Sequence, residues 1–293
     1  MTHFNFFGMQ RSGNHAIIAW LMKNGDPTDQ VFFNNCQPGR RVMGTFRQIE
    51  RDGRRVAVWK RKDDPEIQQV LKRFPDYGET YVSYENTSLS GVFKENFVIA
   101  PDMPDAKPVN VYIYRDLLNW LASTWARLDD ANDSTSIDVV SEVLARASTW
   151  RQNLVLIHDQ AFLDTHKIVP VCYDTWFGDR EYRKTILTRL DVEHRDVSLP
   201  EVQSYGKGSS FDGMSKRKDA AAMAVHERWK EMLDSESFRL ILKVLLMDAD
   251  MVSSLKKYAP DTLDLMQLEF NLALNTMGST SRIGGSQLAQ EGT

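Results

Sequence analysis

The sequence predicts a three-layer α/β/α fold with a central parallel sheet and additional C-terminal helices. Two observations lead to this prediction. Short apolar runs, at Phe4–Phe7, Val109–Tyr114 and Ile168–Tyr173, alternate with segments of helical periodicity. Polar motifs follow the first two runs directly. Because ligands of such sheets bind at the carboxyl ends of the strands, we expect these motifs to form the functional site.

The N-terminal part begins with the strand Phe4–Phe7 and a helix from about Asn14 that ends at Asn24-Gly25, a typical C-cap. Residues 39–62 predict a β-hairpin, with strands over Arg41–Glu50 and Arg54–Lys62 and a turn at Asp52-Gly53. This segment holds nine Lys or Arg residues against two acidic ones. It is a basic region in an otherwise slightly acidic chain.

The remaining elements follow from the same patterns. The expected strands are Thr80–Tyr84, Val109–Tyr114 and Ile168–Tyr173. One helix is expected after Pro65. Six further helices are expected over Leu117–Leu128 (with Asp116 as N-cap), Ile137–Phe162, Tyr182–Leu190, Lys216–Leu233, Ser237–Met247 and Asp261–Asn275.

We expect one domain over residues 1–276, with the basic hairpin 39–62 as an insertion and residues 216–276 as a helical C-terminal part. Residues 277–293 are polar and rich in Gly and Ser, which predicts a disordered tail. The apolar spacing over residues 229–246 is typical of core packing or of a homodimer interface.

Composition excludes several classes of protein. The chain has 36 Lys and Arg against 40 Asp and Glu, a net charge of −4, which argues against a nucleic-acid partner. Cys36 and Cys172 match no metal-ligand spacing, so we expect no metal. No signal peptide and no apolar stretch of 18 residues is found, which predicts a cytoplasmic protein without a membrane span.

The first polar motif, Gly8 to Gly13, has the G-x-x-x-x-G spacing of a phosphate loop. Backbone N–H groups at the start of the next helix favour an anion there. A nucleotide kinase would place Lys and then Ser or Thr after the second glycine, whereas this chain has Asn14 and His15. The cation is Arg11, inside the loop, and the usual magnesium ligand is absent. The motif predicts either a metal-free anion site or an ordinary strand–helix turn.

The second polar motif joins Arg115, directly after an apolar strand, to Ser123 in the following helix. A guanidinium and a hydroxyl are suitable donors to a phosphate monoester. The alternative is a solvated arginine at a strand end and a neutral serine in a helix.

Together, these segments resemble the sulfotransferase family, whose fold is like that of P-loop NTPases. GMQRSGNH (residues 8–15) is similar to its 5′-phosphosulfate loop, YIYRD (residues 112–116) with Ser123 to its 3′-phosphate motif, and VCYDT (residues 171–175) to a later strand end. KGSS (residues 207–210) resembles its late Lys-Gly loop.

The resemblance implies a donor, 3′-phosphoadenosine-5′-phosphosulfate, and transfer of its sulfuryl group to an acceptor hydroxyl without a metal. It implies that Arg11, Ser12, Gly13, Asn14 and His15 contact the phosphosulfate. The 3′-phosphate would be held by Arg115 and Ser123, with help from Lys207 and Gly208, and Tyr173 would lie beside the adenine. The family usually has Thr-Thr in place of Asn14-His15, and no aromatic residue can be assigned to stack on the adenine.

Sulfuryl transfer also needs a general base to deprotonate the acceptor hydroxyl. Glu85 follows the strand Thr80–Tyr84 and is the first candidate; His15, at a helix N-terminus, is the second. The basic hairpin 39–62 predicts either a solubilising surface or a contact with an anionic acceptor such as a glycan.

Three other functions fit parts of the sequence. A P-loop nucleotide or small-molecule kinase shares the loop spacing, but not the lysine and hydroxyl after Gly13. A non-catalytic nucleotide-binding module would bind the same nucleotide without turnover. A helical interaction protein would carry these motifs by chance and have little β-structure.

Overall fold

The computed structural model describes residues 2–52, 54–58, 64–74, 76–104, 107–129, 136–201, 221 and 223–269. Strands and helices alternate along most of this part, as predicted, and helices alone follow residue 173. In the described residues, no helix is long and apolar enough to cross a membrane.

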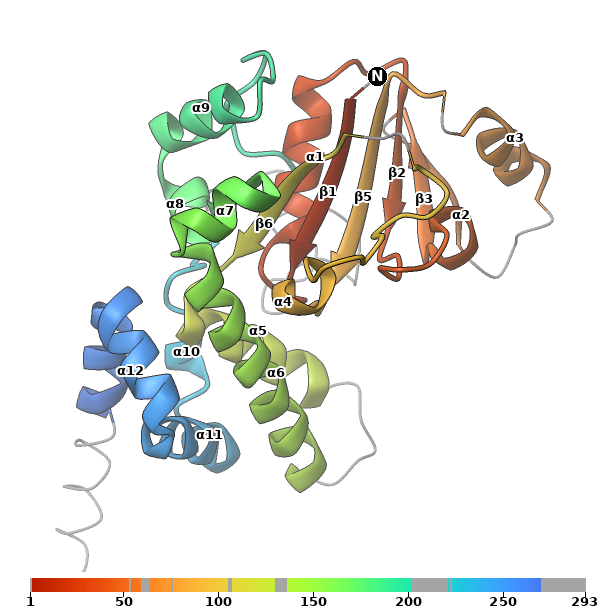
Figure 1. Cartoon of the computed structure of the whole chain (residues 1–293). Helices are drawn as coiled ribbons and strands as arrows, with labels where there is room; N and C mark the ends of the chain where they lie inside the picture. The colour runs from red at the N-terminus through yellow and green to blue at the C-terminus, as the bar shows by residue number, and fades with distance from the viewer. Residues whose placement is uncertain are drawn as a thin grey trace, which may run out of the picture.

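A seven-stranded mixed sheet forms the centre of the described structure, in the order β4-β3-β2-β5-β1-β6-β7 (Figure 1). The strands β2, β5, β1, β6 and β7 are parallel, and β3 and β4 continue the sheet as antiparallel edge strands. Their bounds are β1 Thr2–Gly8, β2 Gln30–Asn34, β3 Gln48–Arg51, β4 Arg54–Val58, β5 Glu79–Glu85, β6 Val109–Tyr114 and β7 Ile168–Cys172.

Residues 39–62 correct the sequence prediction in part. The hairpin exists as β3 and β4, but both strands belong to the central sheet rather than to an insertion. The expected first strand was too long, because its first half is the short helix α2 (Val42–Thr45). The carboxylate of Asp102 accepts hydrogen bonds from the N–H groups of Val42 and Met43 and stabilises that turn. Strand β2, which pairs with β3 and β5, was not predicted.

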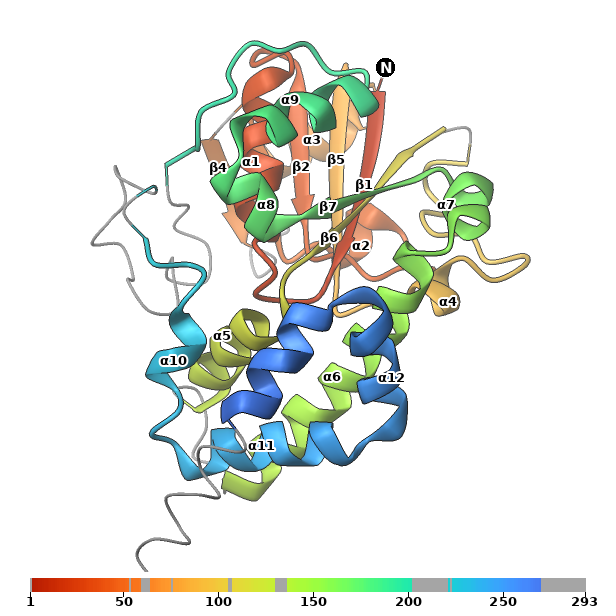
Figure 2. The same cartoon turned by 90° about the vertical axis from the view of Figure 1, so that its left-hand side faces the viewer.

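Helices cover both faces of the sheet because side chains of each strand alternate between two cores. Phe6 packs on the face that α1, α8 and α9 cover, whereas Phe7 packs on the opposite face, with α3, α4 and α6 (Figure 2). The bounds are α1 Asn14–Asn24, α3 Pro65–Arg73, α4 Leu89–Val92, α5 Leu117–Asp129, α6 Ser136–Ile157, α7 Gln160–His166, α8 Tyr173–Gly178 and α9 Arg180–Arg189. The three-layer prediction is confirmed.

The C-terminal part is helical, as expected, and packs on α5 and α6 (Figure 2). It contains α10 Arg228–Glu231, α11 Glu236–Met247, α12 Ala249–Tyr258 and a helical stretch over residues 260–269. The predicted helix Lys216–Leu233 is wrong over residues 223–227, which are not helical. The predicted helix Ile137–Phe162 is two helices, because Asp159 accepts a hydrogen bond from the N–H of Phe162 and caps α7. The expected tail, residues 277–293, lies outside the described residues.

Candidate functional site

The site lies where the order of the parallel strands reverses. Strand β1 is flanked by β5 and β6; the chain passes from β1 to β2 in one direction along the sheet and from β5 to β6 in the other. In open α/β sheets this point, at the carboxyl ends of the strands, is where ligands bind. The loop Gly8–Gly13, Glu85 and Arg115 are brought to this edge by β1, β5 and β6 respectively.

Both glycines of the loop are required by close packing. Gly13 has a φ of 87°, in the left-handed region, and a Cβ there would overlap the ring of Tyr173. A Cβ on Gly8 would come within 2.7 Å of the carbonyl oxygen of Ile113 in the neighbouring strand. Helix α1 begins directly after Gly13, so the N–H groups of its first turn lie at the loop.

The loop is fixed from several sides through Gln10. Its carbonyl accepts a hydrogen bond from the indole of Trp120 (2.8 Å), and its N–H donates to the side chain of Asn86 (2.8 Å). Its side-chain amide donates to the carboxylate of Glu85 (3.1 Å). These contacts hold the loop conformation in which Arg11 adopts a φ of 71°, which is costly for a non-glycine residue.

Arg11 is in a strongly positive environment. Burial first, and then the charges of Arg127, Arg228 and Arg115, lower the pKa of its guanidinium from 12.5 to about 10, while Glu85 acts in the opposite direction. At neutral pH the side chain remains charged. Several cations gathered around one carboxylate favour an anionic ligand at this place.

Arg115 forms a buried polar corner at the end of β6. Its side chain is 2% exposed and donates to the hydroxyl of Ser123 (3.0 Å) and to the carbonyl oxygen of Val225 (2.6 Å). Its Nε lies 3.5 Å from the carboxylate of Asp174. The structure therefore brings Arg115 and Ser123 together, and it excludes the alternative of a solvated strand-end arginine.

Asp174 and Asp116 organise this corner. Asp174 accepts a hydrogen bond from the N–H of Asp116 (2.7 Å), and burial raises the pKa of the Asp174 carboxyl, with Arg115 opposing that shift. Asp116 caps α5, as predicted, by accepting from the N–H of Asn119 (3.0 Å). It also accepts from the hydroxyl of Thr262, which ties the C-terminal helical part to the corner (2.6 Å).

Tyr173 connects the two motifs. Its ring packs against Gly13 of the loop, and the guanidinium of Arg115 lies 5.1 Å from the ring centroid. The side chain is buried, at the start of α8. Burial raises the pKa of its hydroxyl, and the charges of Arg115 and Arg228 oppose this. Gly13 of the loop and Arg115 thus both contact Tyr173, and the charge of Arg11 also acts on its hydroxyl.

The two candidate bases occupy different sides of the loop. Glu85 ends β5 next to Gly8 and bonds to Gln10, within the electrostatic reach of Arg11. His15 points toward β2, where its Nε2 lies 3.0 Å from the side-chain oxygen of Asn34. Of the two, Glu85 is the one in the electrostatic environment of Arg11.

The buried polar atoms without a hydrogen-bond partner among the described residues include the hydroxyl of Ser12, in the loop, and the side-chain oxygen of Asn14, at the start of α1. The Asn14 amide donates to the carbonyl of Met9 (3.2 Å). Buried polar groups are normally satisfied, so a free hydroxyl in an anion loop is compatible with a bound phosphate or sulfate.

The sequence did not identify every residue of the site. Asp174 belongs to the VCYDT segment (residues 171–175), and its position just after a predicted strand could have identified it as a site residue. Arg228, which is buried and contributes to the positive environment of Arg11, belongs to a short helix without any motif. The predicted Lys207 and Gly208 lie outside the described residues.

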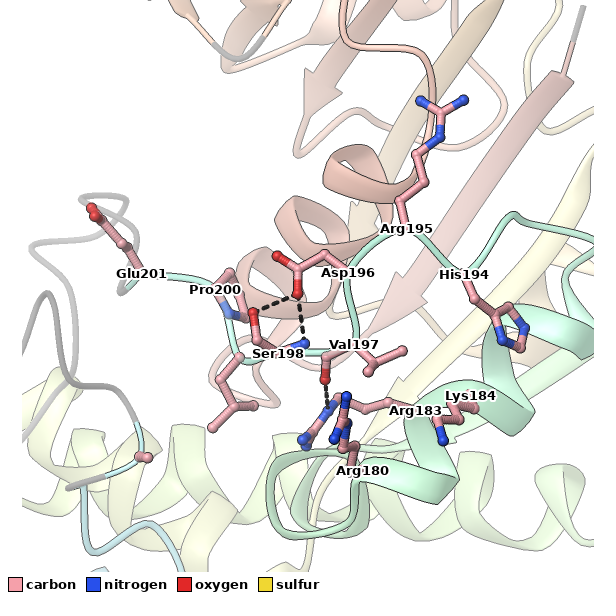
Figure 3. A pocket seen from close by; sticks show the side chains of 12 residues that line it. Arg180, Arg183, Lys184, His194, Arg195, Asp196, Val197, Ser198, Pro200 and Glu201 are labelled. Atoms are coloured by element: carbon pink, nitrogen blue, oxygen red, sulfur yellow. Dashed lines mark hydrogen bonds between the residues drawn. The ribbon is translucent and has the colours of Figure 1, made fainter.

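A cavity of about 700 Å³ lies beside α9, apart from this site (Figure 3). Its basic lining residues bond largely to the protein itself. The guanidinium of Arg183 donates to the carbonyl oxygens of Val197, Trp176 and Phe177, and Lys184 pairs with Glu181. These bonds brace the C-terminal end of α8, and we assign this cavity a structural role.

Comparisons with known proteins find similar solved structures. No protein-family model matches the sequence, and no curated protein is similar to it. Among solved structures, the chain is similar to mouse sulfotransferase SULT7A1 complexed with PAP, with 12% identity, a TM-score of 0.47, and coverage of 88% of this chain and 89% of that chain.

Proposed function

We propose that this protein is a sulfotransferase that moves a sulfuryl group from 3′-phosphoadenosine-5′-phosphosulfate to an acceptor hydroxyl. One observation carries the proposal: Arg11, in the loop after β1, and Arg115, directly after the adjacent strand β6, interact electrostatically with each other and with Tyr173. This spacing suits a nucleotide with phosphates at two ends. Loop and helix N-terminus would hold the 5′ side, and Arg115 with Ser123 the 3′ side.

In this reaction, different residues would stabilise the leaving group and deprotonate the acceptor. Arg11 and the N–H groups of α1 stabilise the charge that develops on the leaving phosphate oxygen. Glu85 accepts the proton of the acceptor hydroxyl, whose oxygen attacks the sulfur as the bond from sulfur to the phosphate oxygen breaks. The products are the sulfated acceptor, 3′-phosphoadenosine-5′-phosphate and a proton on Glu85. Lys207 and Gly208 remain predicted contacts of the 3′-phosphate.

The corner at Arg115 must open for this role. Arg115 is 2% exposed, and the carbonyl of Val225 occupies one of its terminal nitrogens. The carbonyl of His226 accepts a hydrogen bond from the side-chain amide of Asn119 (3.1 Å), and the His226 ring lies 3.8 Å from the carboxylate of Asp174. Nucleotide binding would therefore exchange the Val225 carbonyl for a phosphate oxygen, which is the stronger, charge-assisted acceptor.

Calorimetry tests the proposal. We expect 3′-phosphoadenosine-5′-phosphate to bind with the same affinity in EDTA and in magnesium, because the loop has no magnesium ligand. ATP with magnesium is the control, since a nucleotide kinase would bind it. Tight magnesium-dependent ATP binding together with absent 3′-phosphoadenosine-5′-phosphate binding would overturn the proposal.

Turnover separates the enzyme from a non-catalytic module. A purified protein incubated with ³⁵S-labelled donor and a panel of hydroxyl acceptors should label at least one acceptor. Glu85→Gln should bind the nucleotide normally and lower that rate by about 100-fold or more. Normal turnover of Glu85→Gln would remove Glu85 as the base and direct attention to His15.

A further inference from the structure

The arginines of residues 40–54 are divided between two edges of the sheet. Strand β2 is parallel to β5, so its last residue, Asn34, lies at the same carboxyl edge as the loop. The chain remains at that edge up to Arg47, whose N–H donates to the carbonyl of Asn34 (2.8 Å). Strand β3 then runs back, so Arg51 and Arg54 lie at the opposite edge. A basic segment in sequence is thus two separate regions in space.

The two regions also differ in their partners. At the opposite edge, Arg51 lies 3.3 Å from Glu66 and 3.8 Å from Asp52. At the carboxyl edge, Arg40, Arg41 and Arg47 are exposed, and none of them has an ion pair among the described residues. We call these three the carboxyl-edge arginines.

An acidic group beside the carboxyl-edge arginines, Asp102, is bound by the backbone. Both oxygens of Asp102 accept hydrogen bonds from backbone N–H groups, those of Val42 (2.9 Å) and Met43 (3.0 Å). Lys94 adds a positive charge nearby, over the ring of Phe97, which in turn packs against Gly39. This surface combines free cations with a fixed backbone and is suited to anions.

Position relates the carboxyl-edge arginines to the proposed reaction. Along the carboxyl edge the order is Tyr173, Arg115, the loop, Glu85 and then Asn34 with Arg47. The donor would occupy the β1–β6–β7 side, which leaves the β5–β2 side for the acceptor. Two strand spacings, about 10 Å, separate β1 from β2. His15 bridges this distance by its contact with Asn34.

We propose that the acceptor is an acidic oligosaccharide, whose sulfate or carboxylate groups bind the carboxyl-edge arginines while one of its hydroxyls lies at Glu85. This inference rests on the proposed function and names its substrate class. Guanidinium forks bind sulfate and carboxylate in a bidentate manner. An acidic oligosaccharide carries anionic groups and hydroxyls along one chain. It can therefore contact the carboxyl-edge arginines and Glu85 at the same time.

The test uses a heparin-derived hexasaccharide as the probe and a neutral hexasaccharide as its control, both titrated in the presence of 3′-phosphoadenosine-5′-phosphate. The test variant is R40A/R41A/R47A. The matched control is R54A/K72A/K256A, which removes the same charge from exposed residues elsewhere. The expected result is binding of the acidic probe alone, weakened about tenfold or more in the test variant and less than threefold in the control.

The outcomes of this test distinguish a wrong acceptor class from a wrong proposed function. Equal losses in both triple variants would overturn the inference, because only net charge would then matter. Binding of an acidic tyrosine-containing peptide in place of the hexasaccharide would overturn it as well. Normal binding of 3′-phosphoadenosine-5′-phosphate with no binding of the acidic probe would overturn the acceptor class and leave the proposed function intact. Failure of the nucleotide to bind would overturn the proposed function itself.

Discussion

Arg11 and Arg115 have the same side chain at the ends of neighbouring strands, but the protein treats them in opposite ways. Arg115 is 2% exposed and bonds to Ser123, to the carbonyl of Val225 and, as an ion pair, to Asp174. Burial, together with the charges of three other arginines, lowers the pKa of the Arg11 guanidinium to about 10.

This difference indicates that Arg115 stabilises the fold, whereas the charge of Arg11 lowers the free energy of unfolding. Removal of one member of a buried ion pair leaves the other charge uncompensated and destabilises the fold, whereas the lowered pKa of Arg11 means that its charged form is disfavoured in the folded protein. Residues that a protein holds against its own stability are typical of functional sites. The comparison therefore indicates that a bound anion would stabilise the charged form of Arg11.

The largest expected effect concerns Arg115. The substitution Arg115→Met removes the partner of a buried carboxylate, so the free energy of unfolding should fall by about 3–5 kcal/mol. Urea denaturation followed by circular dichroism measures this change. The double variant R115M/D174N, which removes both charges, should recover part of the loss. A loss below about 1 kcal/mol would show that Arg115 is not a structural cation.

Arg11→Met should have the opposite sign. A lowered pKa in the folded protein means that the charged form is disfavoured there, so at pH 7 this charge reduces stability. Its removal should raise the free energy of unfolding by about 1–2 kcal/mol, less than the full shift implies because the side chain is partly exposed. The same denaturation experiment checks it. A destabilised Arg11→Met variant would contradict the distinction between the two arginines.

Alkaline pH should sharpen the contrast. A bound anion raises the pKa of Arg11. Above about pH 10, where the guanidinium of the nucleotide-free protein has lost a proton, nucleotide binding is therefore coupled to the uptake of a proton. Affinity for 3′-phosphoadenosine-5′-phosphate should be level from pH 8 to 9 and fall as pH rises through about 10, roughly tenfold per unit. Calorimetry at fixed ionic strength, with circular dichroism to show that the fold persists, provides the measurement. A level profile up to pH 11 would remove Arg11 from the anion site.

The smallest effect is expected from Arg127. This exposed residue of α5 lowers the pKa of Arg11 through space. Arg127→Ala should raise the free energy of unfolding by less than about 0.5 kcal/mol, since exposed charges interact weakly. Thermal unfolding in low and in high salt resolves it, because the gain should vanish in high salt. A gain that salt does not change would mean that packing, rather than charge, is responsible.

The sequence was sufficient for the parts of the fold where local pattern and tertiary structure agree. The strands at Phe4–Phe7 and Val109–Tyr114 are continuous apolar runs, and each is followed by a clear turn signal. The proximity of Arg115 and Ser123 was predictable because a helix of known start fixes where its second turn ends. These predictions needed no long-range information.

Other parts depend on contacts between distant residues. The stretch from Arg41 has the composition of a strand, but Asp102 caps a helical turn there. Asp159 divides a continuous helical pattern by capping α7. The carbonyl of Val225 reaches Arg115 across 110 residues, and Arg228 has no motif around it. Such contacts leave no periodic signal in the sequence.

The central claim is that Arg11 and Arg115 hold opposite phosphates of one nucleotide, and a comparison of two ligands tests it most directly. Affinities of 3′-phosphoadenosine-5′-phosphate and of adenosine-5′-phosphosulfate, which lacks the 3′-phosphate, would be measured for Arg11→Met and for Ser123→Ala. Arg11→Met should weaken both ligands by about tenfold or more, and Ser123→Ala should weaken the first about fivefold and leave the second unchanged. Equal losses of both ligands in Ser123→Ala, or none in Arg11→Met, would contradict the claim.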